Sequence, residues 1–368
     1  MFNRKLLRNF DWLLLFTVFA IVAISLITLA STTKSITQNP FYYTKQQAIR
    51  FAVGFAFMLA VLSIDYTYFY RLAPYIYAFS VLLLVIVLFF GDDTHGAQRW
   101  IDLKFIEIQP SEFAKLGIII SLARQLTAQE GSFDSIFSCI PAFLHVALPM
   151  ILIFKQPDLG TSMVFLVIVF GMLFMAGANI KHLLTYITLG LAVGGPLLWF
   201  NLKPYQKMRL IIFTNPYLDP LNYGLQIIQS LIAVGSGGLY GKGLFAPGTQ
   251  NALGFLIEKR TDFIFSAFAE ETGFIGAVVL LLLFMILILR IIRLASLAKD
   301  TFGMLVCIGV AVMMTFHVLV NVGMAIGIMP VTGLPLPLMS YGGSSLLMNM
   351  MAIGVVLNIG MRRQKLMF

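Results

Sequence analysis

The sequence predicts an all-α integral membrane protein, a bundle of about ten transmembrane helices. Of its 368 residues, 59% are hydrophobic and 11% are charged, and the mean hydropathy is +0.91. The apolar residues also gather in runs of roughly 17–25 residues, a length that crosses a bilayer as a helix. A helix is expected because lipid offers no water, so each run must satisfy its own backbone hydrogen bonds.

The apolar runs place the expected spans along the chain. Charged and polar residues, often with glycine or proline, separate one run from the next. The expected spans cover residues 12–31, 48–64, 73–90, 110–126, 137–154, 161–178, 183–201, 263–289, 303–327 and 344–361.

Positive charges indicate the orientation, because Lys and Arg in short loops favour the cytoplasmic side. Arg290, Arg293 and Lys299 lie in one such loop, and Arg362 and Arg363 follow the last span. We therefore expect both termini in the cytoplasm.

One polytopic membrane domain, residues 1–368, accounts for the whole chain. With this orientation the segment 202–262, between the seventh and eighth spans, lies outside as a large extracytoplasmic loop. Residues 223–234 within it alternate Gln with apolar residues at helical spacing. They predict an amphipathic or re-entrant helix, which either lies along the lipid interface or packs as a lid.

Basic residues are frequent on the predicted outer face, where the orientation rule does not expect them. Acidic residues share this face. Both signs of charge together suit an anionic ligand and a reaction on it, whereas contact with anionic lipid headgroups would explain the cations alone. The outer basic residues include Lys155, Lys203, Lys207, Arg209, Lys242, Lys259 and Arg260.

Asp262 lies where the long outer segment turns back into the membrane, within the stretch EKRTDFIFSAFAEE. A charge moved toward hydrocarbon costs roughly 2.5–3.5 kcal/mol even on the mildest insertion scale. A carboxylate kept there suggests a function, so Asp262 is the leading catalytic candidate. The alternative from the residues alone is a structural acid that caps the next helix.

Other outer segments combine charges with turn-forming residues. Glu112 and Lys115 follow Pro110 at helical spacing, so they share one helix face and either hold the bundle together or line a polar cavity. Lys155 to Asp158 present a cation and an anion in one turn, which is also an ordinary Pro-Asp turn. Prolines and glycines around Ser340 indicate a loop that lines a cavity, because freed backbone groups at membrane depth need cover.

No metal or nucleotide motif is present in the sequence. Cys139 and Cys307 fall in predicted spans, as packing residues do, and the histidines have no partner at helical spacing. The glycine-rich stretch 235–243 departs from a phosphate loop, since Ser236 replaces its first glycine and Gly243 its Ser or Thr. We expect a glycine turn there and no ATP site.

Together these motifs resemble the shape, elongation, division and sporulation family. The matching stretches, in order, are QRWIDL, QPSE with Lys115, KQPDLGTS, Thr249-Gln250, EKRTDFIFSAFAEETG and LPLMSYGGSS. The resemblance runs from the first span to the last and is closer to the rod-shape members than to the division members. Two departures precede Asp262: Ile257 stands where the family usually has proline, and Arg260 where it usually has histidine.

The resemblance implies that the protein polymerises lipid II, the undecaprenyl-pyrophosphate-linked disaccharide-pentapeptide, by an inverting displacement. Asp262 would be the general base on the acceptor's 4-hydroxyl, and Arg260 beside it would favour its ionised form. Lys155, Lys242 and Arg99 would stabilise the departing pyrophosphate, and a divalent cation, Mg or Mn, could share that task beside Asp262 or Asp158. The remaining substrate-binding candidates are Trp100, Glu112, Lys115, Gln156, Asp158, Gln250, Arg260 and Ser340.

Two rival functions use the same features. A lipid II flippase would also need intramembrane charges and a basic outer cavity, but its polar groups would continue into the cytoplasmic half. A non-catalytic scaffold of the cell-wall machinery would not need Asp262. The resemblance also implies a class B penicillin-binding protein as partner, besides membrane lipids, and no nucleic acid.

Overall fold

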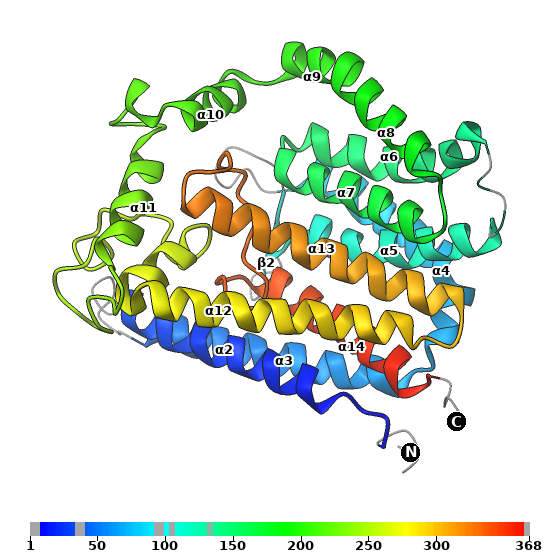
Figure 1. The fold of residues 1–368 in the computed structure, drawn as a ribbon, viewed down its shortest axis with the longest axis horizontal. Helices are drawn as coiled ribbons and strands as arrows, with labels where there is room; N and C mark the ends of the chain where they lie inside the picture. Colours follow the sequence, from blue (N-terminus) through cyan, green and yellow to red (C-terminus); the bar gives the residue numbers. More distant parts are fainter. Residues whose placement is uncertain are drawn as a thin grey trace.

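The computed structural model describes residues 8–33, 41–91, 99–102, 107–129, 131, 133 and 135–363. These residues form a bundle of long helices with one antiparallel hairpin (Figure 1). Gln98 and Leu103 of the QRWIDL motif lie outside the described residues. The helices are α2 (Trp12–Thr33), α3 (Tyr42–Ser63), α4 (Tyr66–Phe90), α5 (Pro110–Ala128), η2 (Ile136–Cys139), α6 (Ile140–Lys155), α7 (Leu159–Met175), α8 (Ile180–Leu189), η3 (Gly190–Gly194), α9 (Gly195–Asn201), α10 (Pro204–Thr214), η4 (Pro216–Leu218), α11 (Leu225–Ser236), α12 (Ile264–Ser296), α13 (Thr301–Ala325) and α14 (Gly343–Met361), and the strands are β1 (Ile101–Asp102) and β2 (Glu107–Ile108).

Every predicted span overlaps a helix, so the all-α class is confirmed. Within the described part of the chain, 8 helical segments are long and apolar enough to cross a membrane. The fourth and sixth predicted spans are not among them, because α5 carries Glu112, Lys115 and Arg124 and α7 has 17 residues. Helix α3 begins at Tyr42, well before the predicted start at residue 48. Its first turns are polar, so hydropathy did not include them in the span.

Burial separates central from peripheral helices. Of the most apolar window in α14, 89% of the residues are buried, against 6% in the run from α8 to α9. Helix α5 is also central, which its composition requires, because ionisable side chains at membrane depth must be covered by protein. Helices α8 and α9 lie along one edge of the molecule (Figure 1).

Two glycines bring α3 and α14 into close contact. A Cβ atom on Gly354 would lie 3.0 Å from the Met58 carbonyl oxygen, and one on Gly54 would lie 3.1 Å from the Met350 side chain. Small residues at such crossings let helix backbones approach closely, which is how helices associate in lipid. This pair sets the position of the loop that precedes α14.

Both ends of the described chain lie at one end of the bundle, which we call the termini end (Figure 1). The Asn9 amide donates to the Met361 carbonyl at 3.5 Å. Ion pairs brace this end: Arg290 with Asp11 at 2.5 Å and Arg362 with Asp65 at 3.0 Å. The start of α12 lies at the opposite end, which we call the Asp262 end.

Helix α12 changes direction at Gly273, where φ is +69°. A Cβ atom there would lie 2.3 Å from the Gly241 nitrogen and 2.6 Å from the Leu239 carbonyl oxygen, so only glycine permits this approach. The predicted glycine turn is confirmed, and it packs against the kink. The first turns of α12, before the kink, are buried against the segment 202–262 that precedes it.

The predicted helix at 223–234 is observed as α11. Its buried face contains Ile227, Ser230 and Ala233. The Ser230 hydroxyl lies 2.6 Å from the Ser266 hydroxyl and donates to the Ala325 carbonyl at 2.6 Å. Helix α11 therefore packs on α12 and α13, which corresponds to the packing alternative of the sequence analysis.

Candidate active site

Asp262 lies immediately before α12, and its backbone is held by two other elements. The Asn321 amide of α13 donates to the Asp262 carbonyl at 3.0 Å and to the Leu334 carbonyl at 2.8 Å. The Tyr341 amide donates to the Arg260 carbonyl at 2.8 Å. The loop between α13 and α14 thus fixes the turn that presents Asp262, as expected for a site on rigid elements.

Ser340 completes this support. Its buried hydroxyl donates to the Thr261 carbonyl at 2.7 Å and accepts from the Leu336 amide at 2.8 Å. Ser340 was a predicted substrate-binding residue. The structure brings it to the Asp262 turn, where its hydroxyl is engaged in positioning the backbone.

Replacing Ser340 by Ala is expected to lower the free energy of unfolding by about 1–3 kcal/mol, because two buried backbone groups would lose their partner. Ser345→Ala is the matched control, since the Ser345 hydroxyl accepts a long 3.3 Å contact from Asn349. Unfolding in detergent, followed by tryptophan fluorescence, measures both. Equal stability of the two variants would contradict the bracing role.

The Asp262 side chain is half-buried and faces Gly333. A Cβ atom on Gly333 would lie 3.7 Å from Asp262 Oδ2, in van der Waals contact with the carboxylate. Although some of its surface reaches solvent, protein packs closely enough around the carboxyl group to raise its pKa from 3.8 to about 6. Loss of water is the largest cause, the charges of Glu258 and Asp158 add to it, and Arg209 opposes it.

The expectation that Arg260 favours the ionised form of Asp262 is not met. The pKa of Asp262 is raised, not lowered, and the cation that acts on it is Arg209 of α10. The Arg260 guanidinium instead lies over the Tyr43 ring, 4.1 Å from its centroid. Proximity in sequence was misleading, because residues two apart in a turn point in different directions.

The turn from Lys155 to Asp158 is clamped by Arg99. The Arg99 guanidinium donates to the Gln156 carbonyl at 2.7 Å and to the Pro157 carbonyl, and lies 3.8 Å from the Asp158 carboxylate. Asp158 also caps α7, accepting from the Thr161 amide at 3.0 Å. These contacts support the interpretation of residues 155–158 as an ordinary Pro-Asp turn. They also use the hydrogen-bond donors of Arg99 within the protein.

The other predicted residues of this region differ in exposure. Gln156 is buried, and its amide donates to the Leu84 carbonyl at 3.2 Å. Lys155 has an exposed side chain in the last turn of α6. Trp100 is half-buried beside β1. Lys155 is thus the most accessible of the three.

Lys242 and Gln250 meet at Glu270, an acidic residue of α12. The Lys242 ammonium lies 2.7 Å from the buried Glu270 carboxylate, and the backbone N–H of Gln250 donates to the same oxygen at 2.8 Å. The charge of Lys242 is therefore neutralised within the protein. Its predicted role at the pyrophosphate would require this ion pair to open.

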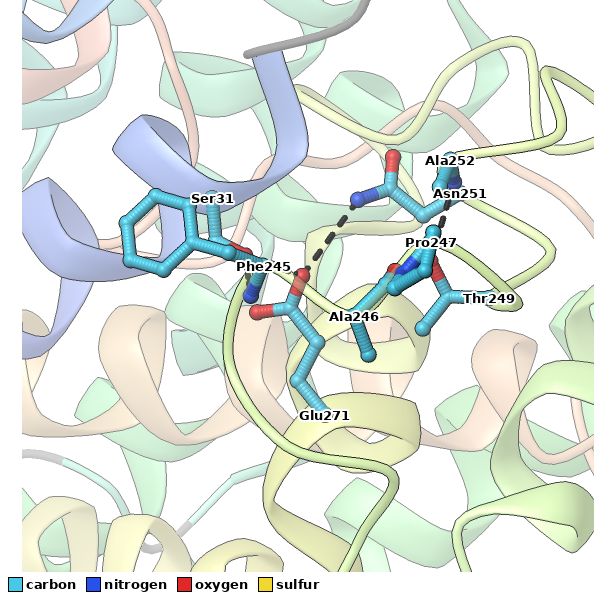
Figure 2. A pocket seen from close by; sticks show the side chains of 8 residues that line it. All are labelled: Ser31, Phe245, Ala246, Pro247, Thr249, Asn251, Ala252 and Glu271. Atoms are coloured by element: carbon cyan, nitrogen blue, oxygen red, sulfur yellow. Dashed lines mark hydrogen bonds between the residues drawn. The ribbon is translucent and has the colours of Figure 1, made fainter.

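A cavity of about 340 Å³ lies beside this ion pair, between α2, α12 and the loop 245–252. Figure 2 shows the Asn251 amide and the Glu271 carboxylate turned toward each other. Glu271 accepts from the Ser31 hydroxyl at 2.6 Å and from Asn251 at 3.4 Å. The buried Lys259 ammonium donates to the Asn251 carbonyl at 2.6 Å, and burial lowers its pKa to about 8.

Glu112 and Lys115 form a fully buried ion pair at 2.7 Å. The Lys115 ammonium also lies 3.1 Å from His317 Nε2 of α13, and His317 Nδ1 lies 3.1 Å from the Pro335 carbonyl. The pair thus joins α5 to α13 and to the loop beside Asp262. This supports the bundle-holding alternative and adds His317, which sequence spacing could not pair with Lys115.

The described side chains around Asp262 and Asp158 do not form a set of ligands for a metal. Among the described residues, no three His, Cys, Asp or Glu side chains converge on one point. The Asp158 oxygens accept from Thr161, and a Glu258 oxygen accepts from the Thr261 hydroxyl at 2.9 Å. We therefore derive no reaction step through a metal.

Comparison with known proteins agrees with the motifs that meet in this site. A family profile described as cell cycle protein, of the FtsW, RodA and SpoVE type, matches residues 8–365. The chain belongs to this family. The resemblance predicted from the motifs is thereby confirmed.

Among relatives within the FtsW, RodA and SpoVE family, the peptidoglycan glycosyltransferase MrdB of Escherichia coli K12 is 40% identical over 316 residues, covering 86% of this chain and 85% of MrdB. The peptidoglycan glycosyltransferase RodA of Treponema pallidum is 35% identical, covering 96% and 98%. A probable peptidoglycan glycosyltransferase FtsW of Geobacter metallireducens is also 35% identical, covering 98% and 97%.

Solved structures of family members share the fold. The rod shape determining protein RodA of Thermus thermophilus superposes with a TM-score of 0.72 at 32% identity, covering 97% of this chain and 98% of that one. A chain from a peptidoglycan synthase complex, described as coordinating polymerization and crosslinking, gives a TM-score of 0.81 at 35% identity, covering 95% and 97%.

Proposed function

We propose that this protein is a peptidoglycan glycosyltransferase that polymerises lipid II during cell elongation. The observation that carries the proposal is the Asp262 carboxyl group, half-buried beside Gly333, with a pKa of about 6. A group with that pKa is ionised at neutral pH yet basic enough to accept a proton during the reaction. The names of the relatives above support the same activity.

The proposed reaction is an inverting displacement at the anomeric carbon of the donor strand. Asp262 takes the proton of the acceptor's N-acetylglucosamine 4-hydroxyl as that oxygen forms the new bond to the anomeric carbon. The bond from this carbon to the phosphate oxygen breaks, and its electron pair leaves with undecaprenyl pyrophosphate. The energy of the reaction comes from the substrate, so no ATP enters.

We place the reaction on the extracytoplasmic side of the inner membrane, with both termini in the cytoplasm. The basic clusters at 290–299 and 362–363 support this orientation. We also propose a class B penicillin-binding protein as the partner that crosslinks the strand, which the match to a chain of a peptidoglycan synthase complex supports.

The pH dependence of polymerisation follows from the pKa of Asp262. A general base works only when ionised, so the rate should rise as pH increases through about 6 and stay level above it. Glu258→Gln removes a negative charge that raises this pKa, so the rising limb should move to lower pH. Rates with labelled lipid II between pH 4.5 and 8, in wild type and in this variant, test the assignment. A limb that is unchanged in Glu258→Gln contradicts it.

Purified protein in lipid vesicles with labelled lipid II tests the function against its rivals. Glycan polymer, resolved by gel electrophoresis, is the expected product of the wild-type chain. Translocation of lipid II without polymer would identify a flippase. Neither product, in the presence of the penicillin-binding partner, would identify a scaffold.

A further inference from the structure

Two arginines and two tyrosines alternate beside the Asp262 turn. The Arg260 guanidinium carbon lies 4.1 Å from the Tyr43 ring centroid, and the Arg50 guanidinium carbon lies 4.3 Å from the Tyr341 ring centroid. The two rings contact each other edge to face, with centroids 5.3 Å apart. We call these four side chains the Arg–Tyr ladder. It joins α3 to the loop before α14 and to the turn that carries Asp262.

Each guanidinium packs against a tyrosine ring, and Arg50 also donates a hydrogen bond to the Tyr341 side chain. A guanidinium packs on a ring with its flat face, whereas its N–H groups point outward in the plane. The Arg50 Nη1 atom is buried and has no hydrogen-bond partner among the residues that the structure describes. Among the described residues, neither arginine forms an ion pair with a carboxylate. The ladder thus presents two positive charges that no carboxylate of the described residues neutralises.

A strip of unpaired polar atoms on α3 continues from the ladder. Within the described part of the chain, Thr44 Oγ1 and Gln47 Oε1 are buried without a hydrogen-bond partner, like Arg50 Nη1. Residues three apart share one helix face, so these atoms lie along one line. Gln47 is 1% exposed, and its amide donates to the Ser340 carbonyl at 3.2 Å. Buried polar atoms usually have partners, so this row indicates a ligand that supplies them.

The depth of Arg50 narrows the class of ligand. Arg50 lies eight residues after Tyr42, the first residue of α3, which is about 12 Å along the helix. An arginine inside a candidate span is a functional residue by default, because its charge is costly there. An anion attached to a lipid tail can reach an arginine at this position along the span, because the tail keeps the anion at the membrane.

We infer that Arg50 and Arg260, oriented by Tyr341 and Tyr43, form a subsite for the diphosphate of a prenyl-linked substrate. Two guanidinium edges can each hold phosphate oxygens through paired, charge-assisted hydrogen bonds. The inference rests on the proposed function and replaces its predicted cations, because Arg99 and Lys242 are occupied by Asp158 and Glu270.

Binding measured in an inactive background tests the subsite apart from catalysis. The probe is undecaprenyl diphosphate, added to the full Asp262→Asn protein in detergent, with undecaprenol as the uncharged comparator. Arg50→Gln should weaken diphosphate binding roughly 10- to 100-fold and leave undecaprenol binding unchanged. Arg50→Lys, which keeps the charge but loses the planar fork, should weaken it less.

Arg124→Gln is the matched control. Arg124 also stacks on a tyrosine, with its guanidinium carbon 5.3 Å from the Tyr70 ring centroid, but it lies at the termini end of the bundle. Its diphosphate affinity should equal that of the parent. Size-exclusion profiles establish that each variant is folded. If Arg50→Gln does not fold, the diphosphate affinity of Arg50→Lys tests the subsite instead.

Three outcomes overturn the inference: equal diphosphate affinity in the Arg50 and Arg124 variants, equal loss of undecaprenol binding, or competition by phosphatidylglycerol as strong as by undecaprenyl diphosphate. The last would indicate a phospholipid site. If wild type polymerises lipid II while no variant changes the affinity, the subsite fails and the proposed function stands. If diphosphate binding depends on Arg50 but wild type makes no polymer, the subsite stands and the proposed function fails.

Discussion

Asp262→Asn is expected to lower lipid II polymerisation by about 10²–10⁴-fold, because the amide has nearly the same shape but cannot accept the proton of the acceptor hydroxyl. Asp262 precedes α12, and its backbone is held through Asn321 of α13. These contacts use backbone groups, so the substitution leaves them in place. Gel-resolved polymer from labelled lipid II, measured as an initial rate, checks the loss.

The stability of this variant separates chemistry from unfolding. The pKa of Asp262 is higher in the folded protein, about 6, than its ordinary value of 3.8. The folded state therefore binds the proton more tightly, so this group's contribution to stability falls as pH rises from about 4 to 6 and stays low above. Asp262→Asn should thus be at least as stable as wild type at pH 7.5.

Glu107→Gln supplies the control for the loss of a carboxylate. Glu107 lies in β2 with an exposed side chain at the same end of the bundle, because its carbonyl accepts from the Ser344 hydroxyl at 3.1 Å. Its polymerisation rate should match wild type. Substantial polymer from Asp262→Asn, or a lower melting temperature that explains its loss, would remove the general-base assignment.

The second large effect is expected at the buried ion pair of α5. Lys115→Met leaves the Glu112 carboxylate buried without its 2.7 Å partner, and losing one member of such a pair costs about 3–5 kcal/mol. Activity should fall as well, because Lys115 contacts His317, and His317 contacts the Pro335 carbonyl in the loop that supports Asp262. Equilibrium unfolding in mixed micelles, with polymerisation of lipid II, measures both effects.

A double variant shows whether the charge itself matters. Glu112→Gln with Lys115→Met removes both charges, so it should recover most of the stability that Lys115→Met loses. Lys181→Met, at an exposed position of α8, should change the free energy of unfolding by less than about 0.5 kcal/mol. If the double variant is as unstable as Lys115→Met, packing and not the uncompensated carboxylate explains the loss.

Several parts of this site were predictable without coordinates. Asp262 follows a long polar segment and precedes an apolar run, so its position at the membrane rim follows from chain order alone. The spacing of Glu112 and Lys115 likewise predicts their contact, because a helix places residues three apart side by side. Each of these inferences depends on local geometry, which sequence patterns carry.

The partners of the cations were not predictable in this way. Arg99 and Lys242 were expected at the pyrophosphate, but they pair with Asp158 and Glu270, which lie 59 and 28 residues away in the chain. No role was predicted for Arg50, because a basic residue near the expected start of a span at residue 48 is ordinary. Which charges stay unneutralised depends on contacts between distant segments.

The sequence by itself determined the membrane class, the order of the helices and the acid at the rim, because hydropathy and helical spacing act over a few turns. Only the tertiary structure decided which side chains surround that acid, because helices from opposite ends of the chain meet there. The pKa of Asp262 follows from that packing, since loss of water and distant charges raise it. The Arg–Tyr ladder likewise exists only where α3, the Asp262 turn and the loop before α14 come together.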